Sequence, residues 1–395
     1  MKIVFTPSDN NLAGAFQSMV RLCTILKDKY NCDILIILRK KGTGQQLLDE
    51  SGLKYQYIPS FNWIVPNHPK TLFRKIELVT RLLTKPFAII YNNLIAKNRF
   101  KRMLIKEKPD LVHLNTSYIY ISALAAYELG IPVVWHIREF LEEDQSKKIW
   151  NTKKGYSLIS KADEVITISN SLYDKYCNIL TNANIVKIYN GLDDKYYKNL
   201  EHVIFKDDKV NLLMVGTINS SKGQKNAIEA CEKVIAKGHY NLKLTFVGEI
   251  NRYAEKLRKE ISNKGLNDYF EFVGLQKDTE KYYSKSDIVL ICSKFEAFGR
   301  VTVEAMMSGC LVIGSNTGGT TELIKDKKTG FLYDVNDVDD LANKIMYCID
   351  HRSESVKIAG GGQNDMLSNF TAESNAKKIF DEYNNILKKG NTYEK

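Results

Sequence analysis

The sequence predicts an α/β protein with two domains, each built on a parallel sheet. At 395 residues the chain is longer than one ordinary core requires and suits two domains of common size. Short β-branched runs alternate with helical stretches from one end to the other. Most of these runs are too continuously apolar to be half-exposed strands, which is typical of parallel sheets covered by helices on both faces.

The expected strands form two sets, because one sheet containing all of them would be unusually wide. In the first half they are Ile3–Phe5, Ile34–Leu38, Leu111–Leu114, Val133–Ile137, Val165–Ile168 and Val186–Tyr189. In the second half they are Leu212–Val215, Leu244–Val247, Phe270–Val273, Ile288–Cys292 and Leu311–Gly314.

A charged, irregular stretch over residues 193–209 indicates the break between the domains. We expect a first domain over 1–195 and a second over 205–372. Residues 373–395 have apolar side chains at helical spacing, and we expect this terminal helix to pack back across the domain junction. Ligands of open parallel sheets bind outside the carboxyl ends of strands, so the cleft between the two domains is the predicted site.

Composition favours a cytoplasmic protein. Hydrophobic residues make up 44% and charged residues 26%, as in ordinary globular proteins. The 7 cysteines form no Cys-x-x-Cys pair, which indicates reduced thiols rather than disulfides or a zinc site. The sequence starts directly with a strand pattern, and no apolar run is long enough to span a bilayer, so we expect neither a signal peptide nor a membrane span.

The net charge of +11 is concentrated between residues 70 and 110. Basic side chains there alternate with aliphatic and aromatic ones, as in PFAIIYNNLIAKNRF at 86–100. Such a segment can lie on an anionic membrane surface, and this is the interpretation we favour. The alternative is a solvated helix pair whose apolar face packs on its own domain. Nucleic acid is not expected, because no recognised nucleic-acid module accompanies the basic run.

The loop at 293–319, SKFEAFGRVTVEAMMSGCLVIGSNTGG, carries the richest chemical signal. It follows an expected strand, and Gly299 precedes a helix expected over 300–307. A helix start at the carboxyl end of a strand suits a diphosphate. Glu296 and Glu304 can both point toward the mouth of the cleft, where carboxylates accept hydrogen bonds from sugar hydroxyls.

Three further loops add candidate residues. Gly216 makes a tight turn after the first strand of the second domain, and Lys222 can act as a point charge on phosphate. Gly14, between the first strand and first helix, either lets the backbone approach a ligand or is a simple loop glycine. His136 ends a strand in WHIREF, where it can hydrogen-bond a sugar or phosphate oxygen or fill a structural role.

Taken together, these motifs resemble the large family 4 of retaining glycosyltransferases, which has the GT-B fold of two facing Rossmann-like domains. The motifs on which this resemblance depends are E-x7-E from Glu296 to Glu304, GCLVIGSNTGGTTELI after it, the loop from Gly216 to Gly223, ITIS at 166–169 and IYNGLD at 188–193. The match is nearly continuous over 212–334 and looser in the first domain, where the family binds its acceptor.

The resemblance implies roles by position. Glu296 would hold donor-sugar hydroxyls and Glu304 the ribose hydroxyls. The diphosphate would lie against Lys222 and the backbone of Phe298, Gly299, Arg300 and Val301. In the remaining loops, Gly14 would approach the donor, His136 the transferred sugar, and Gly248 and Leu275 the base.

Thr217 departs from the family pattern, which usually has an arginine directly after this glycine. One phosphate-binding cation is therefore missing, and we hypothesise that Arg300 replaces it. The alternative is that Arg300 points toward the acceptor or solvent.

The implied reaction is transfer of a hexose-type sugar with retention of configuration. No Asp-x-Asp follows a strand, so no metal site is expected, and no cofactor beyond the nucleotide-sugar donor is implied. A UDP-sugar is favoured over a GDP-sugar. By analogy with the family, the expected acceptor is a saccharide or a polyprenyl-diphosphate-linked saccharide in bacterial capsule or polysaccharide biosynthesis. The protein is expected to be cytoplasmic and peripheral on the inner membrane face.

Three other classes of function compete with this one. A GT-B sugar-nucleotide epimerase or a phosphorylase would need acid/base residues or a pyridoxal lysine, and neither is evident. A non-catalytic partner subunit is disfavoured by the retained Glu296, Glu304 and Lys222. A nicotinamide dehydrogenase is disfavoured because Gly42-Thr-Gly44 lacks the third glycine and follows the wrong strand.

Overall fold

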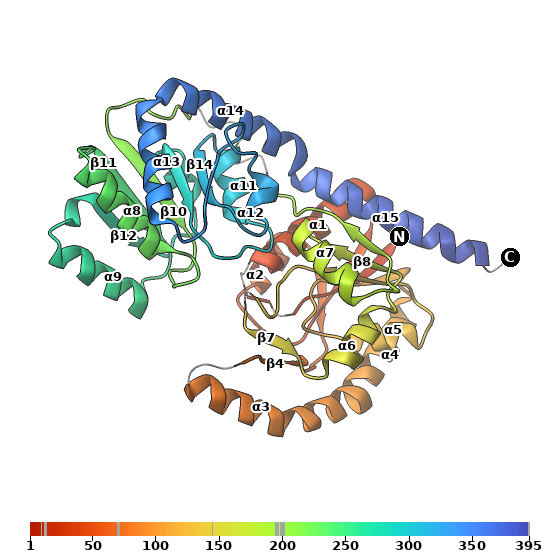
Figure 1. The fold of residues 1–395 in the computed structure, drawn as a ribbon. Helices are drawn as coiled ribbons and strands as arrows, with labels where there is room; N and C mark the ends of the chain where they lie inside the picture. Colours follow the sequence, from red (N-terminus) through yellow and green to blue (C-terminus); the bar gives the residue numbers. More distant parts are fainter. Residues whose placement is uncertain are drawn as a thin grey trace. The chain divides into compact units, whose positions relative to one another are not determined.

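A computed structural model describes residues 1–8, 10–11, 14–68, 72–143, 145–193, 197 and 202–393, apart from the side chains of Arg74 and residues 390–393. The chain divides into two compact units (Figure 1). The first comprises Met1–Gly191 and Ala372–Lys395, and the second Leu192–Thr371. Within the expected linker, residues 194–196 and 198–201 lie outside the described part.

The first unit is built on a 7-stranded sheet whose paired strands all run parallel. Its strands, in spatial order, are β3 (Lys54–Tyr57), β2 (Asp33–Leu38), β1 (Lys2–Thr6), β5 (Leu111–Leu114), β6 (Val133–Ile137), β8 (Glu164–Thr167) and β9 (Ile185–Lys187). A separate antiparallel pair joins β4 (Ile64–Pro66) to β7 (Lys147–Ile149).

Two helices far apart in the sequence cover one face of this sheet. Helix α1 (Gly14–Tyr30) packs against α15 (Ala372–Tyr393), and both share a buried core with β1 and β2. The C-terminal helix therefore completes the core of the first unit, where Tyr383 is fully buried.

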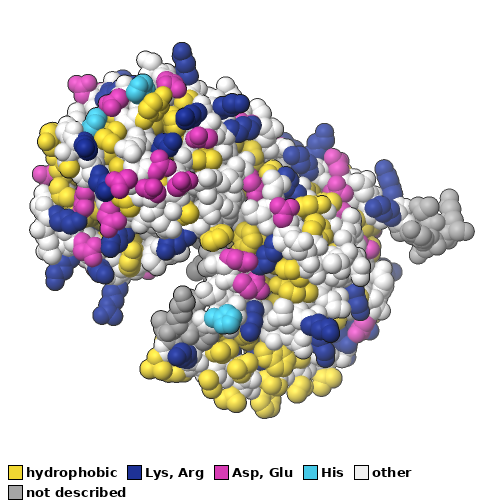
Figure 2. Space-filling view, viewed as in Figure 1, with side chains coloured by type: hydrophobic (Ala, Val, Ile, Leu, Met, Phe, Trp, Pro, Cys, Tyr) yellow, Lys and Arg dark blue, Asp and Glu magenta, His cyan; other side chains and the backbone are white. Residues whose placement is uncertain are grey.

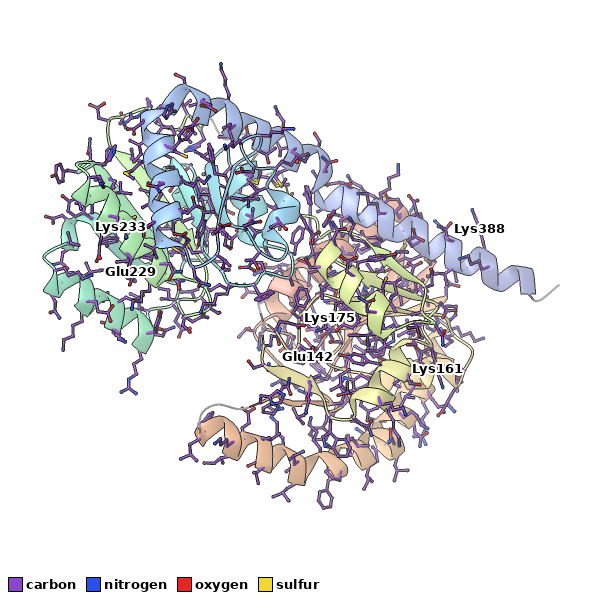
Figure 3. The ribbon with its side chains drawn as sticks, in the orientation of Figure 1. Glu142, Lys161, Lys175, Glu229, Lys233 and Lys388 are labelled. Carbon is purple, nitrogen blue, oxygen red and sulfur yellow. The ribbon has the colours of Figure 1, made fainter. Side chains whose placement is uncertain are left out.

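The first unit contains further helices besides α1 and α15. They are α2 (Gln45–Glu50), α3 (Leu72–Tyr91), a π-helical turn (Asn92–Ala96), α4 (Lys97–Glu107), α5 (Ile121–Tyr127), α6 (Thr152–Ile159) and α7 (Asn170–Ile179). Lys175 on α7 forms an ion pair of 2.6 Å with Glu142, and both are labelled in Figure 3.

The second unit contains a 6-stranded parallel sheet. Its spatial order is β12 (Phe270–Gly274), β11 (Leu242–Val247), β10 (Val210–Val215), β13 (Ile288–Ile291), β14 (Leu311–Ser315) and β15 (Phe331–Tyr333). The helices are α8 (Gln224–Ala236), α9 (Arg252–Asn263), a 3-10 turn (Asn267–Tyr269), α10 (Glu280–Tyr283), α11 (Arg300–Met307), α12 (Thr320–Leu323), α13 (Val338–Asp350) and α14 (Arg352–Asn369).

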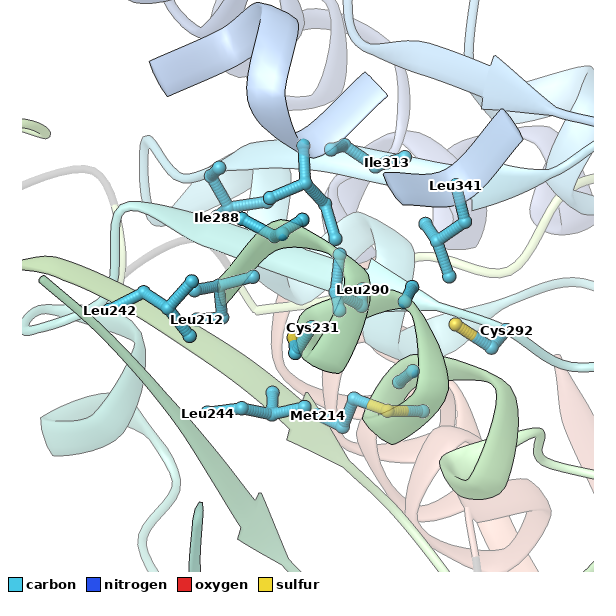
Figure 4. Close-up of a cluster of buried hydrophobic side chains, with 14 of the residues drawn as sticks. Leu212, Met214, Cys231, Leu242, Leu244, Ile288, Leu290, Cys292, Ile313 and Leu341 are labelled. Atoms are coloured by element: carbon cyan, nitrogen blue, oxygen red, sulfur yellow. The ribbon is translucent and has the colours of Figure 1, made fainter. Parts of the chain in front are cut away.

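The core of the second unit lies between its central strands and the neighbouring helices (Figure 4). Leu212 and Leu290, from adjacent strands, are both about 99% buried, and Leu341 of α13 is fully buried against them. Burial of apolar surface at ~25 cal/mol per Å² is the main stabilising term for such a cluster. This core fixes the positions at which β10 and β13 end.

The predicted fold class is confirmed: two α/β units, each with a parallel sheet, and every expected strand has a counterpart. Strands β3, β4, β7 and β15 were not predicted. In the part of the chain that the structure describes, each helix is too short or too polar to cross a bilayer.

Candidate active site

The loop after β13 places Glu296 next to a lysine from the loop after β10. Glu296 Oε1 accepts hydrogen bonds from Lys222 Nζ at 2.7 Å and from Ser293 Oγ at 2.6 Å. The two side chains remain partly accessible, at 30% for Lys222 and 21% for Glu296. A carboxylate and an ammonium group are thus held together, within reach of solvent, at the carboxyl edge of the sheet.

Adjacent strands bring these loops together, because β10 and β13 are neighbours in the sheet. Asn219 Oδ1 accepts from the backbone amides of Ser221 and Lys222 at 2.9 and 3.1 Å, which fixes the turn before α8. Gly223 then begins α8 with φ of 73°, and a Cβ at this position would lie 2.2 Å from the carbonyl oxygen of Cys292. Only glycine permits this close approach.

Helix α11 starts without a side-chain cap. Gly299 precedes it with φ of 94° and, having no side chain, gives the helix start no side-chain cap. Helix starts have backbone amides without intrahelical partners, and the helix dipole favours an anion there. Phe298 is buried and Val301 partly exposed at this start, so the backbone, rather than an apolar side chain, is the group suited to meet an anion.

Both carboxylate oxygens of Glu304 accept hydrogen bonds from side chains. Oε1 accepts from Arg300 Nε at 2.7 Å, and Oε2 accepts from the hydroxyl of Tyr283 at 2.9 Å. Burial, and then the nearby Glu304 charge, raise the pKa of Tyr283 well above its ordinary value, so it stays a donor. Glu304 is held in a fixed orientation, and each oxygen retains a lone pair for a further donor.

Arg300 forms an ion pair with Glu304 and is therefore only partly available to bind a phosphate. Its Nε is engaged by Glu304, and among the described residues its two terminal nitrogens have no hydrogen-bond partner. The side chain therefore has donors that can reach an anion while it orients Glu304.

The other donor-side residues predicted in the second unit lie at successive strand ends. Gly216 follows β10 and Gly248 follows β11, and a Cβ on Gly248 would lie 2.1 Å from the carbonyl oxygen of Gly216. Thr217 is exposed, and its carbonyl accepts from Gln224 Nε2 at 3.1 Å. Leu275 follows β12 with 78% of its surface exposed.

His136 lies in the first unit, near the carboxyl end of β6, and is fully buried. Burial, and then the Arg138 charge, lower its pKa well below the ordinary value, so it is neutral. Arg138 Nη2 lies 3.2 Å from His136 Nδ1. Because arginine has only donors, Nδ1 accepts and the proton resides on Nε2, which has no partner among the described residues.

A polar network surrounds His136. Arg138 Nε donates to Asn115 Oδ1 at 2.8 Å, and Glu139 Oε1 accepts from the amide and hydroxyl of Ser117, both at 2.6 Å. Burial lowers the pKa of Arg138 to about 10, which leaves it charged at neutral pH. Gly14, the other candidate of this unit, is the exposed first residue of α1.

Sequence reasoning missed several residues that hold the site. Ser293 could have been noticed, because it is the second residue after β13 and begins the predicted loop at 293–319. Tyr283 and Asn115 carry no local signal, since their contacts with Glu304 and Arg138 depend on how separate elements pack. Among the described residues, His, Cys, Asp and Glu side chains form no group of three or more that could hold a metal ion.

Two parallel-sheet units, with a lysine, two glutamates and an uncapped helix start at the strand ends of the second, define a GT-B-type transferase. The profile described as "Glycosyl transferases group 1" matches residues 198–365, and that described as "Glycosyltransferase Family 4" matches residues 60–196. The two matches cover most of the chain, which therefore belongs to the family 4 glycosyltransferases.

Similar proteins agree with this assignment. An uncharacterised glycosyltransferase of Methanocaldococcus jannaschii is 29% identical over 62% of this chain and 65% of its own. The N-acetyl-alpha-D-glucosaminyl L-malate synthase of Bacillus anthracis is 25% identical over 58% of this chain and 60% of its own. The chain thus spans less than two thirds of the length of these two relatives.

A third relative, the capsular polysaccharide biosynthesis glycosyltransferase CapM of Staphylococcus aureus, is 24% identical over 74% of this chain and 81% of its own. Among solved structures, HepE of Anabaena in complex with UDP and glucose superimposes with a TM-score of 0.74 at 21% identity. That match covers 98% of this chain and 100% of the HepE chain, and it establishes a shared fold.

Proposed function

We propose that this protein transfers a hexose-type sugar from a nucleotide diphosphate sugar to a saccharide acceptor, with retention of configuration. The observation that carries the proposal is the Lys222–Glu296 pair, 2.7 Å apart, beside the uncapped start of α11. A cation and free amides suit a diphosphate, and a carboxylate suits sugar hydroxyls. Membership of the family supports the proposal that this combination is a donor site.

Each residue of the site has a defined task in the proposal. Lys222 and the α11 amides stabilise the negative charge that grows on the diphosphate as the glycosidic bond breaks. Glu296 accepts hydrogen bonds from the sugar and is kept in place by Ser293. Glu304 accepts from the ribose. The developing charge is met by protein groups, so the proposed reaction proceeds without a metal ion.

The terminal nitrogens of Arg300 supply the positive charge that is missing because Thr217 stands where the family usually has an arginine. His136 donates its Nε2 proton to a sugar or phosphate oxygen. The acceptor attacks the face from which the diphosphate leaves, which retains the configuration. No residue of the site is assigned a covalent nucleophilic role.

We further propose UDP as the donor nucleotide, ahead of GDP, and a lipid-linked saccharide as the acceptor. HepE, which shares the fold, was crystallised with UDP. CapM acts in capsular polysaccharide biosynthesis, so a related polysaccharide pathway is a reasonable place for this chain. The protein would work at the cytoplasmic face of the membrane, in peripheral contact with anionic lipid.

The test is a transfer assay with labelled UDP- and GDP-sugars and a polyprenyl-diphosphate-linked saccharide, with a chelator present. We expect a product from a UDP-sugar, and the anomeric proton coupling in its NMR spectrum should match that of the donor. The Glu296→Gln variant should lose the product. An inverted product, or a reaction that proceeds unchanged in Glu296→Gln, would contradict the proposal.

A further inference from the structure

Helix α3 exposes its apolar side chains and buries a charged one. Among its described side chains the buried one is Lys85, which is 5% exposed, whereas Phe73, Leu83 and Phe87 are 77%, 68% and 74% exposed. Surface helices normally bury their apolar stripe on their own domain. Figure 2 shows the resulting hydrophobic patch over α3, so the alternative of a helix pair packed on its own domain by its apolar face is wrong for α3.

The exposed side chains form one continuous stripe. Their spacing of three, four or seven residues places them on a single helical face: Phe73, Ile76, Leu83, Phe87, Ile90 and Leu94. Lys85 and Asn92 are buried on the opposite side, where Lys85 Nζ donates to the backbone and side-chain oxygens of Asn62 at 2.6 and 2.8 Å.

A basic cavity of about 610 Å³ lies beside this stripe, lined by Arg39, Arg81 and Lys85 together with Phe61, Phe87 and Tyr91. Phe87 belongs both to the stripe and to the cavity wall. Arg39 directly follows β2, so the cavity opens near the carboxyl edge of the first sheet, where ligands of parallel sheets bind.

Three basic side chains line the cavity. Arg81 Nε donates to Glu77 at 2.9 Å, and Arg39 Nε donates to the carbonyl of Ser8 at 2.7 Å. Burial, and then the charges of Arg81 and Arg39, lower the pKa of Lys85 to about 8. An anion in the cavity would relieve this repulsion.

We infer that this cavity binds the phosphate groups of a lipid-linked acceptor, which reaches it from a bilayer on which the apolar stripe of α3 rests. The inference rests on the proposed function and names the protein groups that would select its acceptor. The charges favour a bilayer over a protein partner, because anionic phosphates complement the cluster and an in-plane helix needs only an apolar face.

The experiment is vesicle flotation of the full chain. Three vesicle compositions are used: phosphatidylcholine alone, with phosphatidylglycerol, and with a polyprenyl phosphate. We expect the order polyprenyl phosphate, then phosphatidylglycerol, then phosphatidylcholine. A Phe73→Ser/Leu83→Ser double variant should bind all three more weakly. Arg81→Gln should lose about fivefold in binding to polyprenyl phosphate vesicles, and less to the others.

Lys256→Gln, an exposed lysine on α9, is the matched control and should bind as the wild type does. Wild-type protein should also be thermally stabilised by farnesyl diphosphate but not by farnesol or inorganic phosphate, an arm that needs no variant. Equal binding to all vesicles, or no response to farnesyl diphosphate, would overturn the inference. Stabilisation by UDP, measured in parallel, reports on the donor site alone, so its failure would count against the proposed function instead.

Discussion

Lys222 and Glu296 are the residues on which the proposed donor site depends most. We predict that Lys222→Ala lowers kcat/KM for the sugar donor by about 10²-fold, because one preorganised donor to the leaving diphosphate is lost. Steady-state kinetics checks this. Lys233→Ala is the control, because Lys233 lies on α8, which follows Lys222, and pairs with Asp339 at the surface. Equal losses of kcat/KM in the two variants would show that Lys222 is not part of the donor site.

Two roles are compared for Arg300. Its Nε donates to Glu304 and so orients that carboxylate, and its terminal nitrogens are proposed to bind a phosphate. We predict that Arg300→Gln weakens UDP binding by about tenfold and uridine binding much less. Tyr283→Phe removes only the other support of Glu304 and should affect UDP and uridine alike. If Arg300→Gln weakens both ligands equally, Arg300 orients Glu304 and does not bind phosphate.

His136 should act as a neutral donor over the physiological range. Its pKa is lowered well below the ordinary value by burial and by Arg138, so raising or lowering the pH between about 6 and 8 does not change its charge. We predict no titration of kcat/KM from His136 in that range and a loss of about 10²-fold in His136→Ala. The measurement is a pH–rate profile of both proteins. A wild-type decrease near pH 6.5 that disappears in His136→Ala would show that His136 titrates and would contradict the assignment.

Functional residues could be predicted from the sequence where they lie close together in one loop. Glu296 and Glu304 could be found together because seven residues separate them in a single strand-loop-helix unit. The supports of these groups could not be found. Tyr283 reaches Glu304 from α10, and Asn115 reaches Arg138 from the end of β5. Such contacts are set by packing and leave no pattern in the sequence.

Among the elements, the start of α8 is the most constrained. A side chain at Gly223 would be strained by its φ of 73° and would meet the Cys292 carbonyl. We predict that Gly223→Ala lowers the free energy of unfolding by more than ~2 kcal/mol and moves Lys222 away from Glu296. Denaturant unfolding measures the first effect and donor KM the second.

Gly360→Ala is the control for that variant. Gly360 lies within α14, and an added Cβ would meet no atom within 4 Å. Alanine is the better helix former there by up to ~1 kcal/mol, so this variant should be at least as stable as the wild type. A Gly223→Ala protein as stable as Gly360→Ala would show that the turn does not need glycine.

Most of the parallel strands could be predicted, because continuous β-branched runs carry their own signal. Strands β4, β7 and β15 were missed because three residues are too few for a period to show, and β9, which is equally short, is the exception. The four residues of β3, KYQY, are polar and mostly exposed at a sheet edge. For α3 the sequence predicted an amphipathic helix but left open which face would be covered.

The whole molecule consists of two sheet-based units, and the chain returns to the first unit through α15. The chain leaves the first unit at Gly191 and returns to it at Ala372. That the donor site lies in the second unit stays a prediction from the family motifs. The identity of sugar and acceptor could not be predicted, because no motif in the sequence specifies either of them.

The central claim is that the second unit holds a nucleotide-diphosphate site that works without a metal ion. Calorimetric titration of the full chain with UDP, GDP and ADP, with chelator present, tests it most directly. We predict saturable binding of one nucleotide, UDP, which Lys222→Ala weakens by at least about tenfold and Lys233→Ala leaves unchanged. Absence of binding by all three nucleotides to folded protein, or binding that Lys222→Ala does not weaken, would contradict the account.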